Sequence, residues 1–267
     1  MKRLVILGGG ESGVGAALLG KLKEYNVFIS DSGKIANNYK DVLIHNEIEW
    51  EDGGHTESEI LTADLVVKSP GIPDNVSIVQ KLQYAMIPVV SEIEFAALHT
   101  TANIIGITGS NGKTTTTMMV YHILKQAGLD VAMAGNVGVS FAEQVLTETA
   151  NYVLELSSFQ LDGIKDFRPN IAIITNITPD HLDRYDNKFE NYIASKFRII
   201  MNQTSDDYLL YDSDDEVITS YIKCHQIQST LVPFSLSKIV TNGTYLEQNN
   251  IIIDFNNRDI IMPISNL

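Results

Sequence analysis

The chain has 267 residues, of which 44% are hydrophobic, and it carries a formal net charge of −14 at pH 7. This length suits one large domain or two ordinary ones, and the hydrophobic fraction supports a packed core. A surface this acidic repels phosphate backbones, which argues against nucleic-acid binding. Anionic small ligands then need local positive charge from a lysine, backbone N–H groups or metal ions.

Cys224 is the only cysteine, so no disulfide can form within the chain, which fits a reducing cytosol. The start, MKRLVILGGGESG, has only a short apolar run before its glycines, unlike a secretory signal peptide. No apolar run approaches the roughly 20 residues that span a bilayer. These features predict a cytoplasmic protein that does not enter a membrane.

Short β-branched runs alternate with helix-length amphipathic segments along most of the chain. The expected strands are Leu4–Leu7, Val27–Ser30, Asp64–Lys68, Asn103–Thr108, Tyr152–Leu156 and Ile171–Asn176. The clearest helical patterns between them are Gly13–Tyr25, Val76–Tyr84 and Lys113–Ala127. Strands that alternate with helices predict parallel sheets with crossover connections, and hence an α/β fold.

Two glycine-rich loops, each after a strand and before a helix, predict two α/β domains. We expect a Rossmann-like domain over residues 1–93 and a phosphate-loop ATPase domain with a mostly parallel sheet over residues 94–267. The boundary falls in Pro88–Ala102, where Ser91 can cap a short helix, Glu92–Leu98. After Asp206 the pattern predicts a smaller, strand-rich tail with strands at Leu231–Ser235, Asn250–Phe255 and Asp259–Met262.

The first loop, Gly8-Gly9-Gly10-Glu11-Ser12-Gly13, fits G-x-G-x-x-G between a strand and a helix. Asp31 ends the next strand, near the place of a ribose-binding acid. Ser69-Pro70-Gly71 follows another strand at the same sheet edge, where ligands of open α/β sheets bind. The pattern predicts a nucleotide or pyrophosphate at the helix N-terminus and leaves open NAD, FAD or a sugar nucleotide. The alternative is a tight turn with Asp31 solvated or capping, and an ordinary turn after Lys68.

The second loop, Gly106-Ile107-Thr108-Gly109-Ser110-Asn111-Gly112-Lys113-Thr114-Thr115, is the strongest motif. Successive N–H groups in such a loop form an anion nest, Lys113 reaches the phosphates, and Thr114 supplies a hydroxyl to Mg²⁺. The common pattern wants a glycine where this chain has Ile107, so the match fails at one position. A glycine turn with an exposed lysine is the alternative, and it leaves the flanking strand and helix unexplained.

Three polar residues follow the ends of other strands. Glu155 ends a buried strand, which points its carboxylate at the crevice of the phosphate loop and suits a Mg²⁺ ligand. His181 follows the next strand and could ligate metal or orient a phosphate oxygen, and Asn136 could bind substrate. The alternatives are a partly exposed glutamate, a structural histidine and a strand-end turn.

Lys196 falls on the apolar stripe of an expected helix, Lys188–Met201, together with Phe189, Ile193 and Ile200. A lysine on a core-facing stripe either extends its amine to solvent or is used chemically. Burial lowers the pKa of an amine, and a neutral amine reacts with carbon dioxide to give a carbamate, an anionic oxygen donor suited to Mg²⁺. Spacing alone favours the extended, solvated lysine.

The motifs Thr-Gly-Ser-Asn-Gly-Lys-Thr-Thr, Leu-Glu-Leu-Ser-Ser-Phe-Gln and Asp-His-Leu-Asp-Arg-Tyr together resemble those of the Mur ligase family. The resemblance runs from the first glycine loop to the last strands. Around Glu155 and His181 the chain looks like the branch that adds D-glutamate to UDP-N-acetylmuramoyl-L-alanine, and differs from branches that add L-alanine, diaminopimelate or lysine. It implies a cytoplasmic, monomeric, ATP-dependent ligase of peptidoglycan precursor synthesis.

The resemblance also implies roles for individual residues. UDP, rather than NAD, would bind the first domain, and the substrate-contacting residues would be Gly10, Glu11, Ser12, Asp31, Ser32, Ser69, Pro70, Gly71, Asn136 and Ser157. ATP would bind Gly109, Ser110, Asn111, Gly112, Lys113, Thr114 and Thr115. Two Mg²⁺ ions would bind Thr114, Glu155, His181 and Lys196, the last as a carbamate, and catalysis would use Lys113, Glu155, His181 and Lys196.

The implied chemistry passes through an acyl phosphate that the amine of D-glutamate then attacks. Family members carry a third domain with the amino-acid site, and after Leu267 no sequence remains to build it. We therefore expect a truncated chain that binds nucleotides but does not turn over alone. Two other functions compete: a nucleotide-binding regulatory module without ligase activity, and an NAD-dependent oxidoreductase, which rests on the first loop alone.

Overall fold

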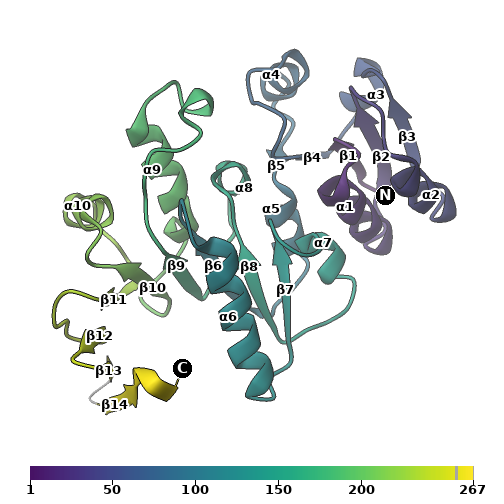
Figure 1. The fold of residues 1–267 in the computed structure, drawn as a ribbon. Coiled ribbons are helices and arrows are strands. Elements are labelled where there is room, and N and C mark those ends of the chain that lie inside the picture. Colours follow the sequence, from purple (N-terminus) through teal and green to yellow (C-terminus); the bar gives the residue numbers. More distant parts are fainter. Residues whose placement is uncertain (256–257, 267) are drawn as a thin grey trace.

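The computed structural model describes residues 1–255 and 258–266, which form an α/β fold around two sheets. The first sheet has five parallel strands in the order β3-β2-β1-β4-β5. The second has nine strands in the order β14-β13-β12-β11-β10-β9-β6-β8-β7. Figure 1 shows the first sheet with its helices at one end of the molecule and strands β11–β14 at the other.

The first sheet and its helices occupy the chain up to Val90. The elements are β1 (Arg3–Leu7), α1 (Glu11–Leu22), β2 (Asn26–Asp31), α2 (Asn37–His45), β3 (Glu49–Asp52), α3 (Glu57–Ile60), β4 (Leu65–Lys68), α4 (Ser77–Tyr84) and β5 (Val89–Val90). The buried strands β1 and β4 are nearly continuous apolar runs, as expected where helices cover a parallel sheet. The expected strands here are confirmed, whereas the short edge strands β3 and β5 were not predicted.

The connecting helix α5 leads into the second sheet. The elements are α5 (Glu92–Ala97), β6 (Asn103–Thr108), α6 (Lys113–Gln126), β7 (Val131–Gly135), α7 (Phe141–Gln144), β8 (Asn151–Glu155), α8 (Ser158–Asp162), β9 (Ile171–Ile174), η1 (Leu182–Arg184), α9 (Phe189–Phe197), η2 (Arg198–Ile200), β10 (Tyr208–Asp212), α10 (Glu216–Cys224), β11 (Thr230–Ser235), β12 (Gly243–Glu247), β13 (Asn250–Phe255), β14 (Arg258–Pro263) and η3 (Ile264–Asn266). The predicted cap is confirmed, because Ser91 Oγ accepts a hydrogen bond from the N–H of Glu94 at 3.2 Å.

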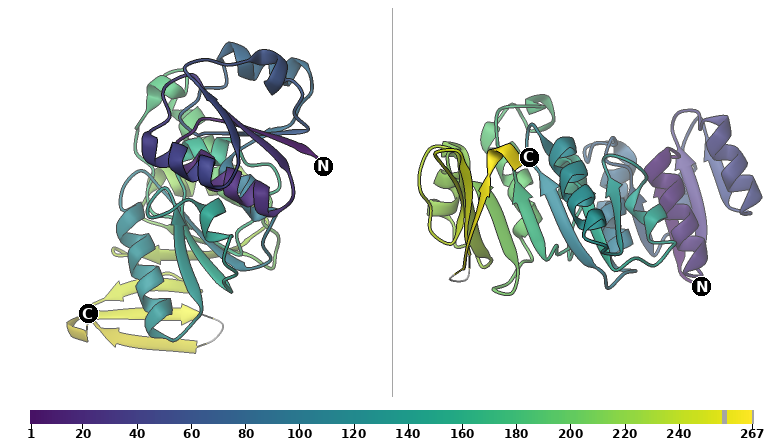
Figure 2. Two further views of the ribbon diagram at one scale, coloured as in Figure 1. Left: turned by 90° about the vertical axis from the view of Figure 1, so that its right-hand side faces the viewer. Right: turned by 60° about the horizontal axis from the view of Figure 1, so that its bottom comes forward.

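The predicted strand-rich tail is the edge of the second sheet. Strands β10, β11 and β12 continue the parallel order from β9, and only β12–β13 and β13–β14 pair antiparallel. Figure 2 shows these last strands at the end of the molecule farthest from the first sheet. For β12 and β13 the connection explains the pairing, since β12 ends at Glu247 and β13 begins at Asn250, and a tight turn joins antiparallel neighbours.

One hydrophobic cluster joins the two sheets. It contains Ile6 and Leu19 from the first unit, Phe95 from the connecting helix, and Phe141 and Tyr152 from the second unit. Within residues 1–255 and 258–266, no helix combines the length and apolar character needed to cross a membrane.

Glu92 is a buried carboxyl in this junction, with only 2% of its surface exposed. Its Oε1 atom accepts a hydrogen bond from the N–H of Ala142, at the start of α7. Its Oε2 atom has no hydrogen-bond partner in the described part of the chain. Burial, with a smaller effect from the charge of Glu11, raises the pKa of Glu92 to about 7. The other charged residues on the elements packed against α5 are Lys21, Lys68, Glu143 and Asp162.

Replacing Glu92 with glutamine should change how stability depends on pH. The pKa of this carboxyl is 4.5 in the unfolded chain and about 7 in the folded one, so the wild type loses stability as pH rises between these values. We expect Glu92→Gln to be more stable than wild type near pH 8, by up to about 3 kcal/mol, and similar near pH 5. Thermal unfolding at both pH values measures this.

Glu94→Gln is the matched control on the same helix. Glu94 is also 2% exposed, but its carboxylate accepts hydrogen bonds from the N–H groups of Lys165, Asp166 and Phe167. An amide cannot accept all three, so this variant should lose stability at both pH values. Parallel pH profiles for wild type and Glu92→Gln would contradict the buried titration.

Candidate functional site

The first glycine loop lies at the carboxyl edge of the first sheet. Gly10 precedes α1 as its N-cap residue, and the N–H of Gly9 donates to Asp31 Oδ2 at 2.7 Å. The N–H of Gly33 donates to Asp31 Oδ1 at 2.7 Å. Ser69 lies against the loop. If Gly8 carried a Cβ atom, that atom would lie 2.4 Å from Ser69 Oγ. The structure thus gives Asp31 a part in fixing the loop, beside the ribose contact that the sequence predicts.

The loop residues share this edge because β2, β1 and β4 are parallel neighbours. Their carboxyl ends align Leu7 with Ser30 and with Lys68. The predicted substrate-contacting residues at the ends of these strands therefore lie along one edge of the sheet: Gly10, Glu11, Ser12, Asp31, Ser32, Ser69, Pro70 and Gly71.

The phosphate loop joins β6 to α6, as the motif predicts. Lys113 Nζ donates to the carbonyl oxygens of Gly109 and Ser110, both at 2.9 Å, so the ammonium lies over its own loop. The segment after β9 supports the loop from beneath. Ser110 Oγ donates to the carbonyl of Thr178 at 2.8 Å, and the N–H of Asn111 donates to Asn176 Oδ1 at 2.9 Å.

Glu155 lies beside the start of the helix that follows the loop. It is 2% exposed, and it accepts hydrogen bonds from Thr114 Oγ1 at 2.7 Å and from Asn136 Nδ2 at 2.8 Å. The structure therefore brings together three residues that the sequence predicts from three separate strand ends.

This cluster fits a magnesium site in which the ligand supplies part of the coordination. The described residues contain no group of three or more His, Cys, Asp or Glu side chains close enough to bind a metal by themselves. Mg²⁺ usually takes one or two protein oxygens and completes its shell with water and substrate phosphates. A hydroxyl and a carboxylate, from Thr114 and Glu155, provide such oxygens next to the phosphate loop.

Lys196 is buried behind the phosphate loop, with 2% of its surface exposed. Its Nζ atom donates to Thr108 Oγ1 at 3.3 Å and lies 5.1 Å from the ring centroid of Tyr192. Burial, together with the nearby charge of Lys113, lowers the pKa of Lys196 to about 7. The solvated alternative is therefore wrong for this lysine. The helix that carries Lys196 is shorter than the expected Lys188–Met201. It is α9, which ends at Phe197, and a 3-10 turn follows it.

His181 and Ser157 have local contacts of their own. His181 has a left-handed backbone, with φ of 48°, and a side chain that is 54% exposed. Its ring centroid lies 5.2 Å from that of Phe159.

Ser157 caps α8 through a reciprocal pair of hydrogen bonds with Gln160. Cap formation occupies the Ser157 hydroxyl, and its predicted substrate contact remains a prediction.

Arg184 is a residue at the site to which the sequence analysis gave no role. Its guanidinium donates to the carbonyls of Pro70 and Gly71, at 3.3 and 3.4 Å, and lies 4.6 Å from the ring centroid of Phe159. These contacts connect the loop after β9 to the loop after β4 in the first unit. A basic residue three positions after His181, in a chain of net charge −14, was the available signal.

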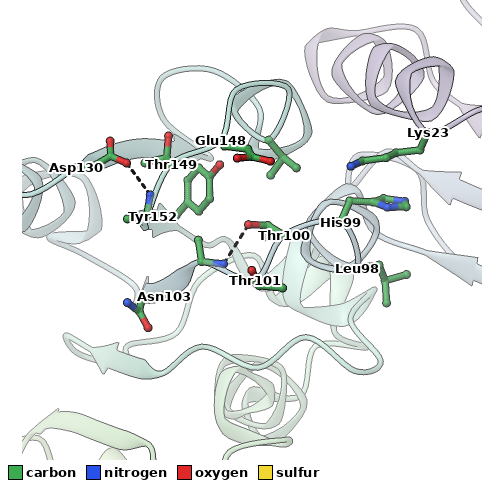
Figure 3. Close-up of a pocket in the computed structure, with 13 residues that line it drawn as sticks. Lys23, Leu98, His99, Thr100, Thr101, Asn103, Asp130, Glu148, Thr149 and Tyr152 are labelled. Atoms are coloured by element: carbon green, nitrogen blue, oxygen red, sulfur yellow. Dashed lines mark hydrogen bonds between the residues drawn. The ribbon is translucent and has the colours of Figure 1, made fainter.

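One large cavity lies elsewhere. It measures about 850 Å³ and is lined by residues near the amino ends of β6 and β8, including Lys23, His99, Asn103, Glu148 and Tyr152 (Figure 3). Neither glycine loop contributes to its lining. The two loops instead lie at the carboxyl ends of their strands, on the opposite edge of each sheet, so the chemistry of the motifs is not in this cavity.

Comparison with known families gives two matches along the chain. The Mur ligase middle domain matches residues 107–262, and the MurD N-terminal domain matches residues 3–78. A UDP-N-acetylmuramoylalanine--D-glutamate ligase of Christiangramia forsetii is 57% identical over 267 residues, which are 100% of this chain and 60% of the relative. The protein of the same name in Bacteroides fragilis is 52% identical over 254 residues, 95% of this chain and 57% of the relative.

Solved structures agree in fold. A UDP-N-acetylmuramate:L-alanyl-gamma-D-glutamyl-meso-diaminopimelate ligase from Neisseria meningitides aligns with a TM-score of 0.67 at 17% identity, over 97% of this chain and 86% of that one. The UDP-N-acetylmuramate-alanine ligase MurC from Thermotoga maritima aligns with a TM-score of 0.57 at 20% identity, over 98% and 58%. At such identities the likeness shows the shared fold alone.

Alanine at two glycines of the phosphate loop should separate backbone strain from lack of space. Gly109 has φ of 149° and Gly112 has φ of 80°. A Cβ at Gly109 would lie 2.0 Å from Thr175 Oγ1, whereas one at Gly112 meets nothing within 4 Å. We expect Gly112→Ala to lose about 1–2 kcal/mol through strain, and Gly109→Ala to lose roughly 1–3 kcal/mol more through overpacking. Urea unfolding compares them, and equal losses would show that the space beside Thr175 does not matter.

Proposed function

The chain belongs to the Mur ligase family, and from this we propose that the whole protein joins D-glutamate to UDP-N-acetylmuramoyl-L-alanine in an ATP-dependent step of peptidoglycan precursor synthesis. The chain spans 57–60% of the length of the curated relatives described above, so the activity of the whole protein is inferred. The observation that carries the proposal is the cluster of Thr114, Asn136 and Glu155 beside the phosphate loop, in a chain 57% identical to a ligase of that name.

The first unit is proposed to bind the UDP part of the substrate. The N-terminus of α1 provides free backbone N–H groups and a positive dipole end for a pyrophosphate. Ser12, Ser32 and Ser69 would add hydroxyls at this edge of the sheet, together with backbone groups of Gly10, Glu11, Pro70 and Gly71. Asp31 is proposed to contact the nucleoside, although both of its oxygens also hold backbone N–H groups.

The second unit is proposed to bind ATP through Gly109–Thr115. Lys113 is already held over the loop by two backbone carbonyls, and a nucleotide phosphate would replace those weaker partners for its ammonium. When bound, Mg²⁺ would neutralise charge between two anionic reactants. We propose two such ions, held by Thr114, Glu155, His181 and a Lys196 carbamate, with Asn136 and Ser157 near the substrate.

The proposed reaction has two steps. The carboxylate of the L-alanyl group attacks the γ-phosphorus of ATP, and ADP leaves, which gives an acyl phosphate. The amine of D-glutamate then attacks the acyl carbon, phosphate leaves, and the amine loses its proton as the amide forms. Lys113 and the loop N–H groups stabilise negative charge that develops on the transferred phosphoryl group. The acidic surface and the small anionic substrates fit a cytoplasmic monomer that binds neither nucleic acid nor membranes.

The test is a coupled assay of the whole protein with UDP-N-acetylmuramoyl-L-alanine, D-glutamate, ATP and Mg²⁺. We expect one phosphate released per amide formed, and none when any component is omitted. Binding of ATP without amide formation would instead indicate a nucleotide-binding module.

Lys113→Ala should weaken ATP binding by roughly 10- to 100-fold, as expected for loss of a charged hydrogen-bonding group. Lys125→Ala, on the exposed end of the same helix, is the matched control and should bind ATP as wild type does.

Carbamylation of Lys196 can be measured directly. The neutral amine would attack carbon dioxide, form an N–C bond and release one proton to water. Because the pKa is about 7, the neutral fraction and the carbamate should increase as pH rises through 7 at a fixed concentration of dissolved carbon dioxide. Carbon-13 NMR with labelled bicarbonate should show a carbamate resonance that Lys196→Met lacks. Identical spectra for the two proteins would rule out the adduct.

A further inference from the structure

The N-terminus of α7 lies where elements of both sheets meet. Helices α1, α5 and α7 pack against one another, and Figure 1 shows them side by side between the first sheet and β7. Helix α1 comes close to the start of α7 at Gly15, where an added Cβ would lie 2.0 Å from Ser140 Oγ. Ser140 itself caps α7, since its Oγ accepts a hydrogen bond from the N–H of Glu143 at 3.2 Å.

Glu92 closes this junction from the connecting helix. Its carboxyl binds the N–H of Ala142, in the first turn of α7, and the whole side chain is buried. It therefore satisfies one of the N–H groups that the start of a helix leaves without a partner. The proposed reaction does not use Glu92, and a buried carboxyl is costly to retain for packing alone when one oxygen has no partner among the residues that the structure describes.

The junction is connected to both nucleotide sites by short, well-bonded segments. On one side, α1 begins at Glu11 directly after the first glycine loop. On the other side, a short segment runs from Asn136 to Ser140, and it is bound back to β7 through the N–H of Gly135 and the carbonyl of Val139, 3.2 Å apart. Asn136 then donates to Glu155 beside the phosphate loop.

We propose that Glu92 is a positioning residue that couples the two nucleotide sites by holding the start of α7 against α1. A nucleotide phosphate at the N-terminus of α1 fixes that helix, α1 fixes Ser140, and the segment from Ser140 to Asn136 then fixes the partner of Glu155. This inference rests on the proposed function, because it takes a uridine nucleotide at the first loop and an adenine nucleotide at the second.

Thermodynamic linkage provides the test. The affinity for uridine diphosphate is measured by calorimetry with and without saturating ADP and Mg²⁺, and the affinity for ADP with and without uridine diphosphate. In wild type we expect each nucleotide to strengthen binding of the other by the same factor, at least about fivefold. Glu92→Leu removes the acceptor and keeps apolar volume, so the factor should fall to within about twofold of one while each nucleotide still binds alone.

Three further variants separate positioning from general stability. Glu92→Gln retains an acceptor oxygen and should keep the coupling. Ser140→Ala weakens the same junction by a milder change and should reduce the coupling, which covers the case in which Glu92→Leu does not fold. Glu94→Gln lowers stability on the same helix, away from α7, and should keep the coupling.

The outcomes are distinct. If either nucleotide fails to bind the wild type, the proposed function fails. If both bind but independently, or if Glu92→Leu and Ser140→Ala couple as wild type does, the inference is overturned and the proposed function stands. Equal loss in Glu94→Gln would also overturn it, because the effect would then reflect stability alone.

Discussion

The site depends on the register of three neighbouring parallel strands. Glu155 pairs with Ile107 on β6 and with Gly135 on β7, so the carboxyl ends of all three strands stop at one level. The next residues along β6 and β7 then reach the same point: the phosphate loop follows Thr108, and Asn136 follows Gly135. A slip by one residue would turn the Glu155 side chain to the other face of the sheet. Backbone pairing therefore decides where the polar groups meet. Their own hydrogen bonds then orient the side chains within the site.

Basic side chains lie near the phosphate loop although the protein as a whole is acidic. The protein carries a net charge of −14, yet two lysines, Lys113 and Lys196, lie near the phosphate loop. The charge of Lys113 is one reason that the pKa of Lys196 falls, and burial is the larger one. A neutral buried amine would leave Lys113 as the main cation facing a bound triphosphate. Conversion of Lys196 to a carbamate would reverse its sign, which suits a position behind a loop that also needs metal ions.

The central features of the fold follow from local sequence, whereas several contacts do not. Buried strands such as β1 are mostly apolar runs, and the glycine-rich loop before Lys113 lies between a strand and a helix, as its motif predicts. Edge strands such as β5, with two residues, depend on a neighbour for their pairing and carry no periodic signal. The apolar side chains of α6 predict burial, but Met118, Met119 and Ile123 are all more than half exposed. Amphipathic spacing shows which residues share a face, and only tertiary packing decides whether anything covers it.

The junction between the sheets combines apolar packing with directional polar contacts. An apolar interface alone would allow α1 to slide on α7, because dispersion contacts are individually weak and have little direction. Hydrogen bonds are directional, and those at the start of α7 involve backbone groups that cannot turn away without breaking the helix. Arg184 adds a second link, because it binds the carbonyls of Pro70 and Gly71 from the loop after β9. The Glu92 contact from α5 to α7 and the Arg184 contact to the loop after β4 lie at separate points of the junction, and two directional contacts restrain rotation as well as separation.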